Sequence, residues 1–262
     1  MDERPSIPEE TAHTFAIHQS FENLDSGWRS FPGHYFLYAS SGAFVLDVGD
    51  MRWILPPHRA AWIAAETPIR VRVEGVVTCT SVLFAKGTID PPQFDCRVFP
   101  ISTLAREMVQ HASRWGPERN RADKVANTFF LSLASVCEEL AAHPDQFWLP
   151  QGKSSEMKEG LEWVLSQLEE APSFADLAQN VHLSERTLAR RFKEEIGLTW
   201  RQFVRRARMI RSMEMLAEDR YKIIEIAQTV GFSSVSAFNR AFRDFSGETP
   251  SAYRQRLANS SG

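Results

Sequence analysis

Short hydrophobic runs separated by turn-forming dipeptides fill the chain from about Phe15 to Phe84. The runs include residues 36–38, 44–46, 52–55 and 76–84, and Ser-Gly, Gly-Asp, Pro-Pro and Glu-Gly separate them. Residues 70–74 alternate polar and apolar side chains, which is the period of a strand with one face in water. Short strands at this spacing predict a β-sandwich or a β-barrel.

The pattern becomes helical after Pro100. Residues 101–115 and 121–142 contain no Pro or Gly, and apolar side chains recur in them at helical spacing. The Trp115-Gly116-Pro117 segment between them predicts a turn, and therefore an antiparallel helical hairpin. Residues 143–156 are polar and rich in Pro, Gly and Ser, so we predict a linker there. The rest of the chain is predicted to form short helices.

This helical C-terminal part contains an internal repeat. The segment Ala178-Gln179-x-Val181 recurs 49 residues later, and the positions Arg190, Phe192, Gly197 and Thr199 recur 50 residues later. Each copy predicts a helix, a tight turn and a second helix. A small Ala in the first helix lets the second cross it closely, which is the geometry of a helix-turn-helix unit.

Capping residues mark where these helices begin. Ser173 and Ser184 are predicted N-caps in the first copy, and Gly231 occupies the turn of the second copy, where a positive φ is expected. A capping box, Thr199-x-x-Gln202, is predicted to start a helix over residues 199–216 that joins the two units.

The charge is divided unevenly along the chain. The net charge is −3, but residues 173–262 hold 15 Lys and Arg against 10 Asp and Glu, and residues 1–172 hold 15 against 23. Residues 182–211 alone carry nine basic and three acidic side chains. This asymmetry predicts a module that binds a polyanion, although a solvated helix surface gives the same pattern.

Composition narrows the class of protein further. Hydrophobic residues make up 43% of the chain, which is enough for a packed core. The three cysteines form no Cys-x-x-Cys pair, so neither a disulfide framework nor a zinc finger is expected. The N-terminus is acidic and no run of 18 apolar residues occurs, so we expect a cytoplasmic protein without a membrane partner.

Three segments of the C-terminal part resemble the signature of the AraC/XylS family of bacterial transcription regulators. They are residues 227–232, Ser236-x-Phe238-x-Arg240-x-Phe242 and residues 247–254. The resemblance covers about residues 157–257 and implies two helix-turn-helix units that read neighbouring segments of the DNA major groove. The base-reading positions that it implies are Arg186, Ala189 and Arg190 in the first unit, and Val235, Ser236, Asn239 and Arg240 in the second. Further DNA contacts are expected from Arg191, Lys193, Arg205 and Arg243.

Arg190 and Arg240 are the strongest of these candidates, because Arg binds guanine edges bidentately and both occupy equivalent positions of the repeat. Ala189 and Val235 offer at most a contact with a thymine methyl group. Arg205 lies on the connecting helix, so we expect it to touch phosphate only.

The first ninety residues resemble the cupin sensor domain found in part of the same family, with Pro56-Pro57-x-Arg59-Ala60-x-Trp62-Ile63 as its central strand. Cupin metal positions would fall on Arg29, Phe31, Tyr35 and Ile69, and none of these is a usual ligand. His34 and His58 lie nearby but off the motif. The resemblance therefore predicts a barrel without metal or cofactor.

The mouth of that barrel is a candidate site for a small amphipathic or aromatic molecule. Its expected lining residues are Arg29, Phe31, Tyr35, Trp62 and Ile69. An ordinary barrel core without any ligand is an equal alternative.

Together these patterns predict an α+β chain. A sensor and dimerisation domain over residues 1–142 would hold a cupin-like β-barrel at about 13–90 and the helices at 101–142. A linker at 143–156 and the two-unit domain at 157–257 would follow. The predicted function is a DNA-binding transcription regulator that responds to a small effector, without enzymatic activity. Its expected partners are double-stranded DNA and a second copy of the chain, with RNA polymerase as a further candidate.

Two other functions remain as alternatives. One is a cupin-fold enzyme with an appended nucleic-acid-binding domain, but the metal positions are lost and no Gly-x-Ser-x-Gly, P-loop or dinucleotide motif is present. The other is repair of DNA alkyl damage by a cysteine methyl acceptor, but Cys79, Cys96 and Cys137 lack the spacing for it.

Overall fold

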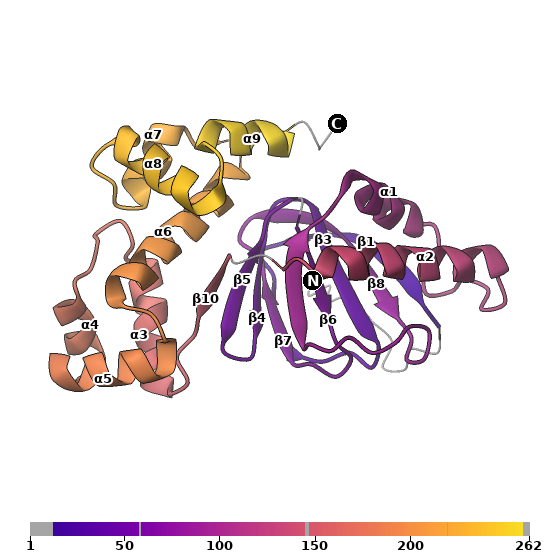
Figure 1. The fold of residues 1–262 in the computed structure, drawn as a ribbon, viewed down its shortest axis with the longest axis horizontal. Helices are drawn as coiled ribbons and strands as arrows, with labels where there is room; N and C mark the ends of the chain where they lie inside the picture. The colour runs from indigo at the N-terminus through magenta and orange to yellow at the C-terminus, as the bar shows by residue number, and fades with distance from the viewer. Residues whose placement is uncertain (1–12, 58, 145–146, 219, 259–262) are drawn as a thin grey trace. The chain divides into compact units, whose positions relative to one another are not determined.

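The computed structural model describes residues 13–57, 59–144, 147–218 and 220–258 (Figure 1). The chain forms two compact units: residues 1–49 with 53–146, and residues 50–52 with 147–262. The first holds the β-sheets and the second is largely helical, so the predicted α+β class is confirmed. No helix within the described ranges is long and apolar enough to cross a membrane.

The first unit contains two antiparallel sheets. One has the order β1 (Phe15–Glu22), β8 (Val76–Phe84), β3 (His34–Ser41), β6 (Arg59–Ile63) and β9 (Cys96–Pro100). The other includes β5 (Met51–Leu55), β4 (Phe44–Val48), β7 (Ile69–Arg72) and β2 (Asp25–Arg29) in that order. The described strands do not close into the expected barrel, because β1 and β9 pair with no strand of the second sheet.

The register of the first sheet decides which side chains share a face. Phe36 lies opposite Trp62 and Val82, whereas Leu37 lies opposite Ala61 and Ser81. Because successive side chains on a strand point to opposite faces, the two sets face opposite sides of the sheet.

Two helices cover the face that carries Phe36. They are α1 (Thr103–Ala112) and α2 (Lys124–Ala141), each shorter than the predicted helical segment. Ser102 and Asp123 cap them by accepting hydrogen bonds from backbone N–H groups of the first turn. Buried side chains of both helices pack with those of the sheet in one hydrophobic core, and Trp62 stacks on Phe84 inside it.

In the second unit, residues 147–262 start with the short strand β10 (Trp148–Pro150). The N–H of Gln151, directly after this strand, donates a hydrogen bond to the carbonyl of Asp50 at 2.7 Å. Its helices are α3 (Ser155–Ser166), α4 (Phe174–Asn180), α5 (Glu185–Ile196), α6 (Trp200–Leu216), α7 (Ile223–Thr229), α8 (Val235–Ser246) and α9 (Pro250–Ala258). Residues 143–156, expected to be a linker, thus contain a strand and the start of α3.

The two copies of the sequence repeat form the same local structure. In the turn of the first copy, the N–H of Leu183 donates to the carbonyl of Ala178 at 2.9 Å. In the turn of the second copy, the N–H of Phe232 donates to the carbonyl of Ala227 at 2.8 Å. Gly231 has φ +75°, as predicted, and His182 at the equivalent position of the first copy has φ +53°. The duplication is therefore structural as well as sequential.

The predicted caps are also present. Ser173 and Asp176 form a reciprocal capping box at α4, and Ser184 accepts from Thr187 at α5. Thr199 and Gln202 form the predicted capping box at α6. These caps orient the helices, because each fixes the chain direction at a helix start.

Each helix-turn-helix unit has its own core. Ring contacts join Phe174, Phe192, Trp200 and Phe203 in the first unit, with ring centroids 5.6–6.4 Å apart. In the second, Phe238, Phe242 and Tyr253 pack in a chain of aromatic contacts with the buried methionines of α6. Because α6 contributes to both cores, one helix supports the two units.

Candidate DNA interface and small-molecule pocket

Helix α5 presents most of the side chains that the sequence singled out in the first unit. Arg186, Ala189, Arg190 and Lys193 are exposed, whereas Leu188 and Phe192 on the opposite face are buried. Arg190 lies 3.1 Å from a carboxylate oxygen of Glu194, one turn further along the helix. An exposed pair of this kind is worth a few tenths of a kcal/mol, so Arg190 is available to a stronger acceptor.

Arg191 differs from the other basic residues of α5. It is half-buried, and its Nε lies 4.0 Å from Glu195, whose carboxylate also accepts hydrogen bonds from the N–H groups of Lys153 and Ser154. In this conformation Arg191 is directed toward Glu195, and its expected contact with DNA stays a prediction. Its position on the helix flank, beside the start of α3, was not visible in the repeat.

Helix α8 exposes fewer of the predicted DNA-contacting side chains than the sequence suggested. Ser236, Arg240 and Arg243 are exposed, but Val235 and Asn239 are half-buried. Val235 packs against the core of the second unit, and the Oδ1 atom of Asn239 is buried with no hydrogen-bond partner among the described residues. Bidentate reading of adenine needs both amide atoms of an Asn at the surface, so this conformation of Asn239 does not present that edge.

The arginines of α6 fall into two groups. Arg201 and Arg205 are exposed, and Arg205 lies 3.3 Å from Asp244 of α8. Arg206 and Arg208 are half-buried, over the rings of Trp148 and Phe232 respectively. Burial lowers the pKa of both guanidinium groups. The basic segment 182–211 thus exposes fewer cations than its composition suggests.

Several cations on these helices have no ion pair or side-chain hydrogen bond to another described residue. They are Arg186, Lys193, Arg201, Arg240 and Arg243. Their positive charge is thus available to an external anion such as phosphate.

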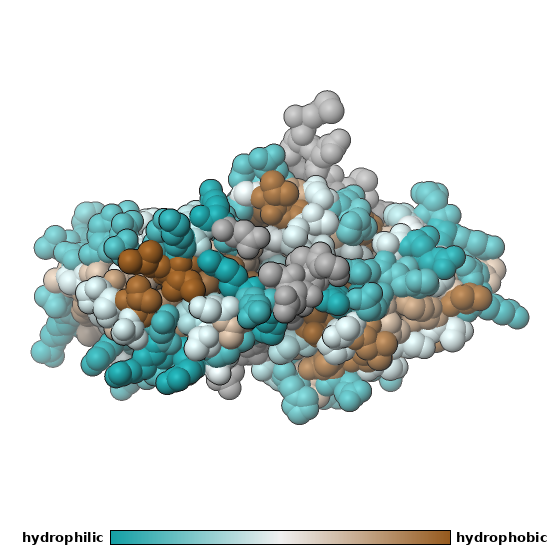
Figure 2. Space-filling model, turned by 90° about the horizontal axis from the view of Figure 1, so that it is seen from above, coloured by the Kyte–Doolittle hydropathy of each residue, from teal (hydrophilic) through white to brown (hydrophobic). Residues whose placement is uncertain are grey.

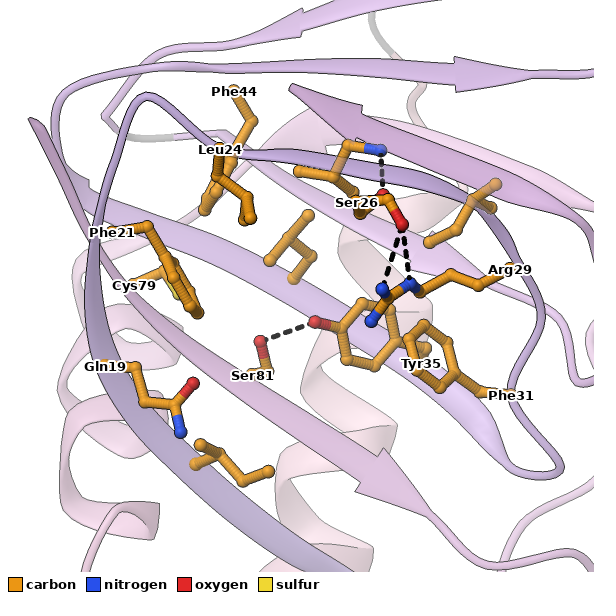
Figure 3. Close-up of a pocket in the computed structure, with 14 residues that line it drawn as sticks. Gln19, Phe21, Leu24, Ser26, Arg29, Phe31, Tyr35, Phe44, Cys79 and Ser81 are labelled. Carbon is orange, nitrogen blue, oxygen red and sulfur yellow. Dashed lines mark hydrogen bonds between the residues drawn. The ribbon is translucent and has the colours of Figure 1, made fainter. Parts of the chain in front are cut away.

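A pocket lies between the two sheets of the first unit (Figure 3). Its empty space is about 520 Å³, including the part open to solvent. The apolar side chains that line it are Ile17, Phe21, Leu24, Phe31, Leu37, Phe44, Ile69 and Val71. Gln19, Ser26, Arg29, Tyr35, Cys79 and Ser81 supply the polar atoms. This composition, mostly apolar with a few polar groups, is typical of a small-molecule site.

The polar groups of the pocket are held in place by the protein. Both Nε and Nη2 of Arg29 donate to the carbonyl of Ser26, at 3.3 and 2.9 Å (Figure 3). The hydroxyls of Tyr35 and Ser81 share a hydrogen bond of 2.8 Å in the interior. Burial raises the pKa of Tyr35 well above its usual range, and it raises that of Cys79 to about 11. Both groups therefore stay uncharged at neutral pH.

Four of the five expected lining residues meet at this pocket: Arg29, Phe31, Tyr35 and Ile69. Trp62 does not, because it lies opposite Phe36 in the register and so faces α1 and α2, where it is fully buried. Sequence reasoning also missed Gln19, Cys79 and Ser81. The alternation of residues 76–84 indicates that Cys79 and Ser81 share a face, but not which face looks inward.

The cupin metal positions do not fit a metal in this chain. Arg29, Phe31, Tyr35 and Ile69 offer a cation, two aromatic rings and an alkyl group, whereas transition metals need several nitrogen, sulfur or carboxylate donors. The described part of the chain holds no group of three or more His, Cys, Asp or Glu that could bind a metal ion. His34 is buried, and its Nδ1 accepts from the N–H of Ala65 at 3.1 Å, while His58 lies outside the described residues.

Comparisons with known proteins relate the chain to transcription regulators. A family model described as a helix-turn-helix domain matches residues 177–256. The HTH-type transcriptional regulator NimR of Escherichia coli is 26% identical over 257 residues, which are 97% of this chain and 91% of that protein.

Two further comparisons cover a smaller share of the chain. The HTH-type transcriptional activator RhaR of Pectobacterium carotovorum is 37% identical over 86 residues, which are 33% of this chain and 30% of that protein. The crystal structure of the DNA-binding domain of AdpA in complex with a target DNA is 30% identical, with a TM-score of 0.38, over 40% of this chain and 96% of that chain. These comparisons show that the chain contains a helix-turn-helix domain and is similar to HTH-type transcriptional regulators.

Proposed function

We propose that this regulator reads two neighbouring segments of the major groove of DNA, one with α5 and one with α8. The observation that carries the proposal is the equivalence of Arg190 and Arg240, which occupy the same position of the duplicated unit and are both exposed. Two such units on one rigid helix are expected to contact groove segments about one helical turn, or ~34 Å, apart. Arg186, Lys193 and Arg243 extend the same surface, and a contact with RNA polymerase stays a prediction.

The first unit is, in this proposal, a cupin-type sensor whose pocket binds a small effector. Support comes from the apolar lining and from the few polar groups that the protein holds in place. The role is regulatory and involves no catalysis, and we place the protein in the cytoplasm.

We also propose that α1 and α2 supply a homodimer contact. Hydrophobic residues gather in separate patches on the face seen in Figure 2. Leu104 of α1 and Val125 and Leu131 of α2 are large apolar residues with exposed fractions of 61%, 72% and 47%. Exposed apolar side chains on adjacent helices are a common feature of protein interfaces.

The test of DNA reading uses the full chain and two duplexes: one selected by the protein from a random library, and a scrambled version of the same composition. Arg190→Ala and Arg240→Ala should each cost about 1–3 kcal/mol on the selected duplex, because each removes a contact with base edges. Neither should lower affinity for the scrambled duplex as much. Fluorescence anisotropy at fixed salt measures both affinities.

Arg205→Ala is the matched control, because Arg205 lies on α6 rather than on a recognition helix and pairs with Asp244. It should weaken both duplexes to the same degree. If the Arg190 and Arg240 variants also weaken both duplexes equally, these helices clamp phosphate and do not read bases. If only one variant loses its preference, the helix-turn-helix unit whose variant keeps it has no role in sequence reading.

A further inference from the structure

We propose that the pocket between the two sheets selects a small monoanion: an oxyanion head, such as a carboxylate, on an aromatic or short aliphatic body, with the head bound at Arg29. This inference rests on the proposed sensor function and deepens it. It names the charge of the effector, which the lining composition leaves open.

Arg29 is the charged side chain among the described residues that line the pocket. Its Nε and Nη2 atoms both donate to one carbonyl oxygen, that of Ser26, and no carboxylate of the described residues pairs with it. The nearest acidic residue on the same strand, Asp25, is paired with Arg70 instead. The guanidinium is thus half-buried, fixed in direction and without a counter-ion among the residues that the structure describes.

The surroundings strengthen attraction for an anion. Interactions between charges grow as the effective dielectric falls, and the walls next to Arg29 are the rings of Phe31 and Tyr35, whose centroids lie 4.5 Å apart (Figure 3). A guanidinium held in one orientation matches the two oxygens of a carboxylate. The site around Arg29 therefore has both the charge and the geometry for an oxyanion.

The rest of the pocket disfavours a cation and accepts an apolar body. Tyr35 and Cys79 stay protonated at neutral pH because burial raises their pKa, so neither contributes negative charge. Phe21, Phe44 and Leu37 line the remaining wall. The Tyr35–Ser81 hydroxyl pair is the other fixed polar feature, and it suits a neutral substituent on the body of the ligand.

The experiment compares three probes that share one body: 4-phenylbutanoate, 4-phenylbutanamide and 4-phenylbutylamine. Isothermal titration calorimetry on the full chain at pH 7.5 measures each affinity. The carboxylate should bind about tenfold or more tightly than the amide, since a charge-assisted hydrogen bond to Arg29 is lost in the amide. The amine, which is a cation, should bind more weakly than the amide.

Substitutions then assign the preference to Arg29. Arg29→Met, which keeps the length without the charge, should lower affinity for the carboxylate to that for the amide, and Arg29→Lys should keep part of the preference. Arg121→Met is the matched control, because Arg121 is an exposed arginine outside the pocket lining. It should change none of the three affinities. Thermal unfolding of each variant checks that the fold is intact.

The outcomes separate this inference from the function on which it rests. Equal binding of carboxylate and amide would overturn the anion preference while leaving a small-molecule pocket. A carboxylate preference that survives in Arg29→Met would overturn the assignment to Arg29. If none of the probes binds, both the inference and the sensor role of this pocket are wrong, whereas the DNA reading by α5 and α8 is tested separately.

Discussion

At the scale of single residues, the two glycines of the second helix-turn-helix unit show how local backbone and packing combine. Gly231 and Gly247 both have positive φ, +75° and +83°, where a side chain is strained. A Cβ on Gly231 would also lie 2.9 Å from the carbonyl oxygen of Leu168 and 2.6 Å from Nη2 of Arg208, whereas a Cβ on Gly247 would meet nothing within 4 Å. Position 231 therefore requires glycine because of both its backbone angle and its close neighbours, whereas position 247 favours glycine because of its backbone angle alone.

We expect Gly247→Ala to lower the free energy of unfolding by about 1 kcal/mol, the cost of the left-handed backbone alone. Gly231→Ala should cost more, about 2–3 kcal/mol, because overlap with backbone adds to the strain. Urea unfolding of the two variants, followed by circular dichroism, measures the difference. Equal losses would show that the turn relaxes around the added methyl group.

The geometry of α5 and α8 explains why some of the predicted DNA-contacting residues are half-buried. Arg191 and Arg190 are adjacent in sequence, but only Arg190 is on the outer face of α5, because 100° separates successive residues of a helix. The outward position of Val235 and Asn239 was expected from the resemblance to the AraC/XylS family. In the second unit the partly buried Phe232 and Val235 pack against the core, so α8 presents a narrower outer face.

At the scale of elements, Glu195 fastens the start of α3 to the C-terminal turn of α5. Its carboxylate accepts from the N–H groups of Lys153 and Ser154 at 2.8 Å each, and from the Ser154 hydroxyl at 2.9 Å. Ser154 is the N-cap residue of α3, yet its hydroxyl bonds to Glu195 rather than to the first turn of its own helix. One carboxylate thus takes the place of a local cap.

Glu195→Ala should lower the free energy of unfolding of the helical part, residues 147–262, by about 1–3 kcal/mol, since it leaves several hydrogen-bond donors without an acceptor. Glu194→Ala is the matched control, because Glu194 is exposed and, among the described residues, forms an ion pair with the exposed Arg190 alone. Its loss should change stability by less than about 0.5 kcal/mol. Hydrogen exchange at the amides of Lys153 and Ser154 should speed up in the Glu195 variant alone. Unchanged exchange at both amides would contradict this role.

The same contact has a pH dependence of known sign. Burial raises the pKa of Glu195, but the hydrogen bonds from Ser154 and Lys153 outweigh it and hold the pKa below the usual range. Because the folded pKa is lowered, the stabilisation is present above the unfolded value of about 4.3 and is lost as pH falls through the folded pKa. The stability difference between wild type and Glu195→Ala should therefore shrink on going from pH 6 to pH 3.

At the scale of the whole molecule, the exposed cations set how strongly DNA binding depends on salt. Seven basic residues of the recognition and connecting helices are exposed: Arg186, Arg190, Lys193, Arg201, Arg205, Arg240 and Arg243. Each phosphate contact contributes about −0.9 to the slope of log affinity against log salt. Four further arginines of α5 and α6, namely Arg191, Arg206, Arg208 and Arg211, are half-buried and are not expected to contribute.

We therefore expect a slope no steeper than about −6 for each bound chain, against about −10 if every cation of these helices met a phosphate. Lys193→Gln should flatten the slope by about 1, whereas Arg206→Gln should leave it unchanged. Anisotropy titrations between 50 and 300 mM salt on a scrambled duplex give these values. A slope near −10, or a flatter slope in Arg206→Gln, would mean that the half-buried arginines turn outward on DNA.

The caps, turns and repeat of the helical half could be predicted from the amino-acid sequence alone. Caps such as Ser173 and Thr199, the turn at Gly231 and the 49- to 50-residue repeat are local signals, because each depends on hydrogen bonds and backbone angles within a few residues. The duplicated pattern then made the exposed positions of α5 predictable. The same signals identified Arg190 and Arg240 as equivalent.

Contacts between residues far apart in sequence determine which side chains meet at the pocket and which arginines remain exposed. Alternation along a strand defines two faces but not which one lies inward, so Trp62 and Ile63 were indistinguishable until the register with Tyr35 and Phe36 was known. Likewise, the open sheets in place of a barrel depend on pairing between strands far apart in sequence. Arg206 and Arg208 became unavailable through contacts with Trp148 and Phe232, residues more than 20 positions away, which no local pattern encodes.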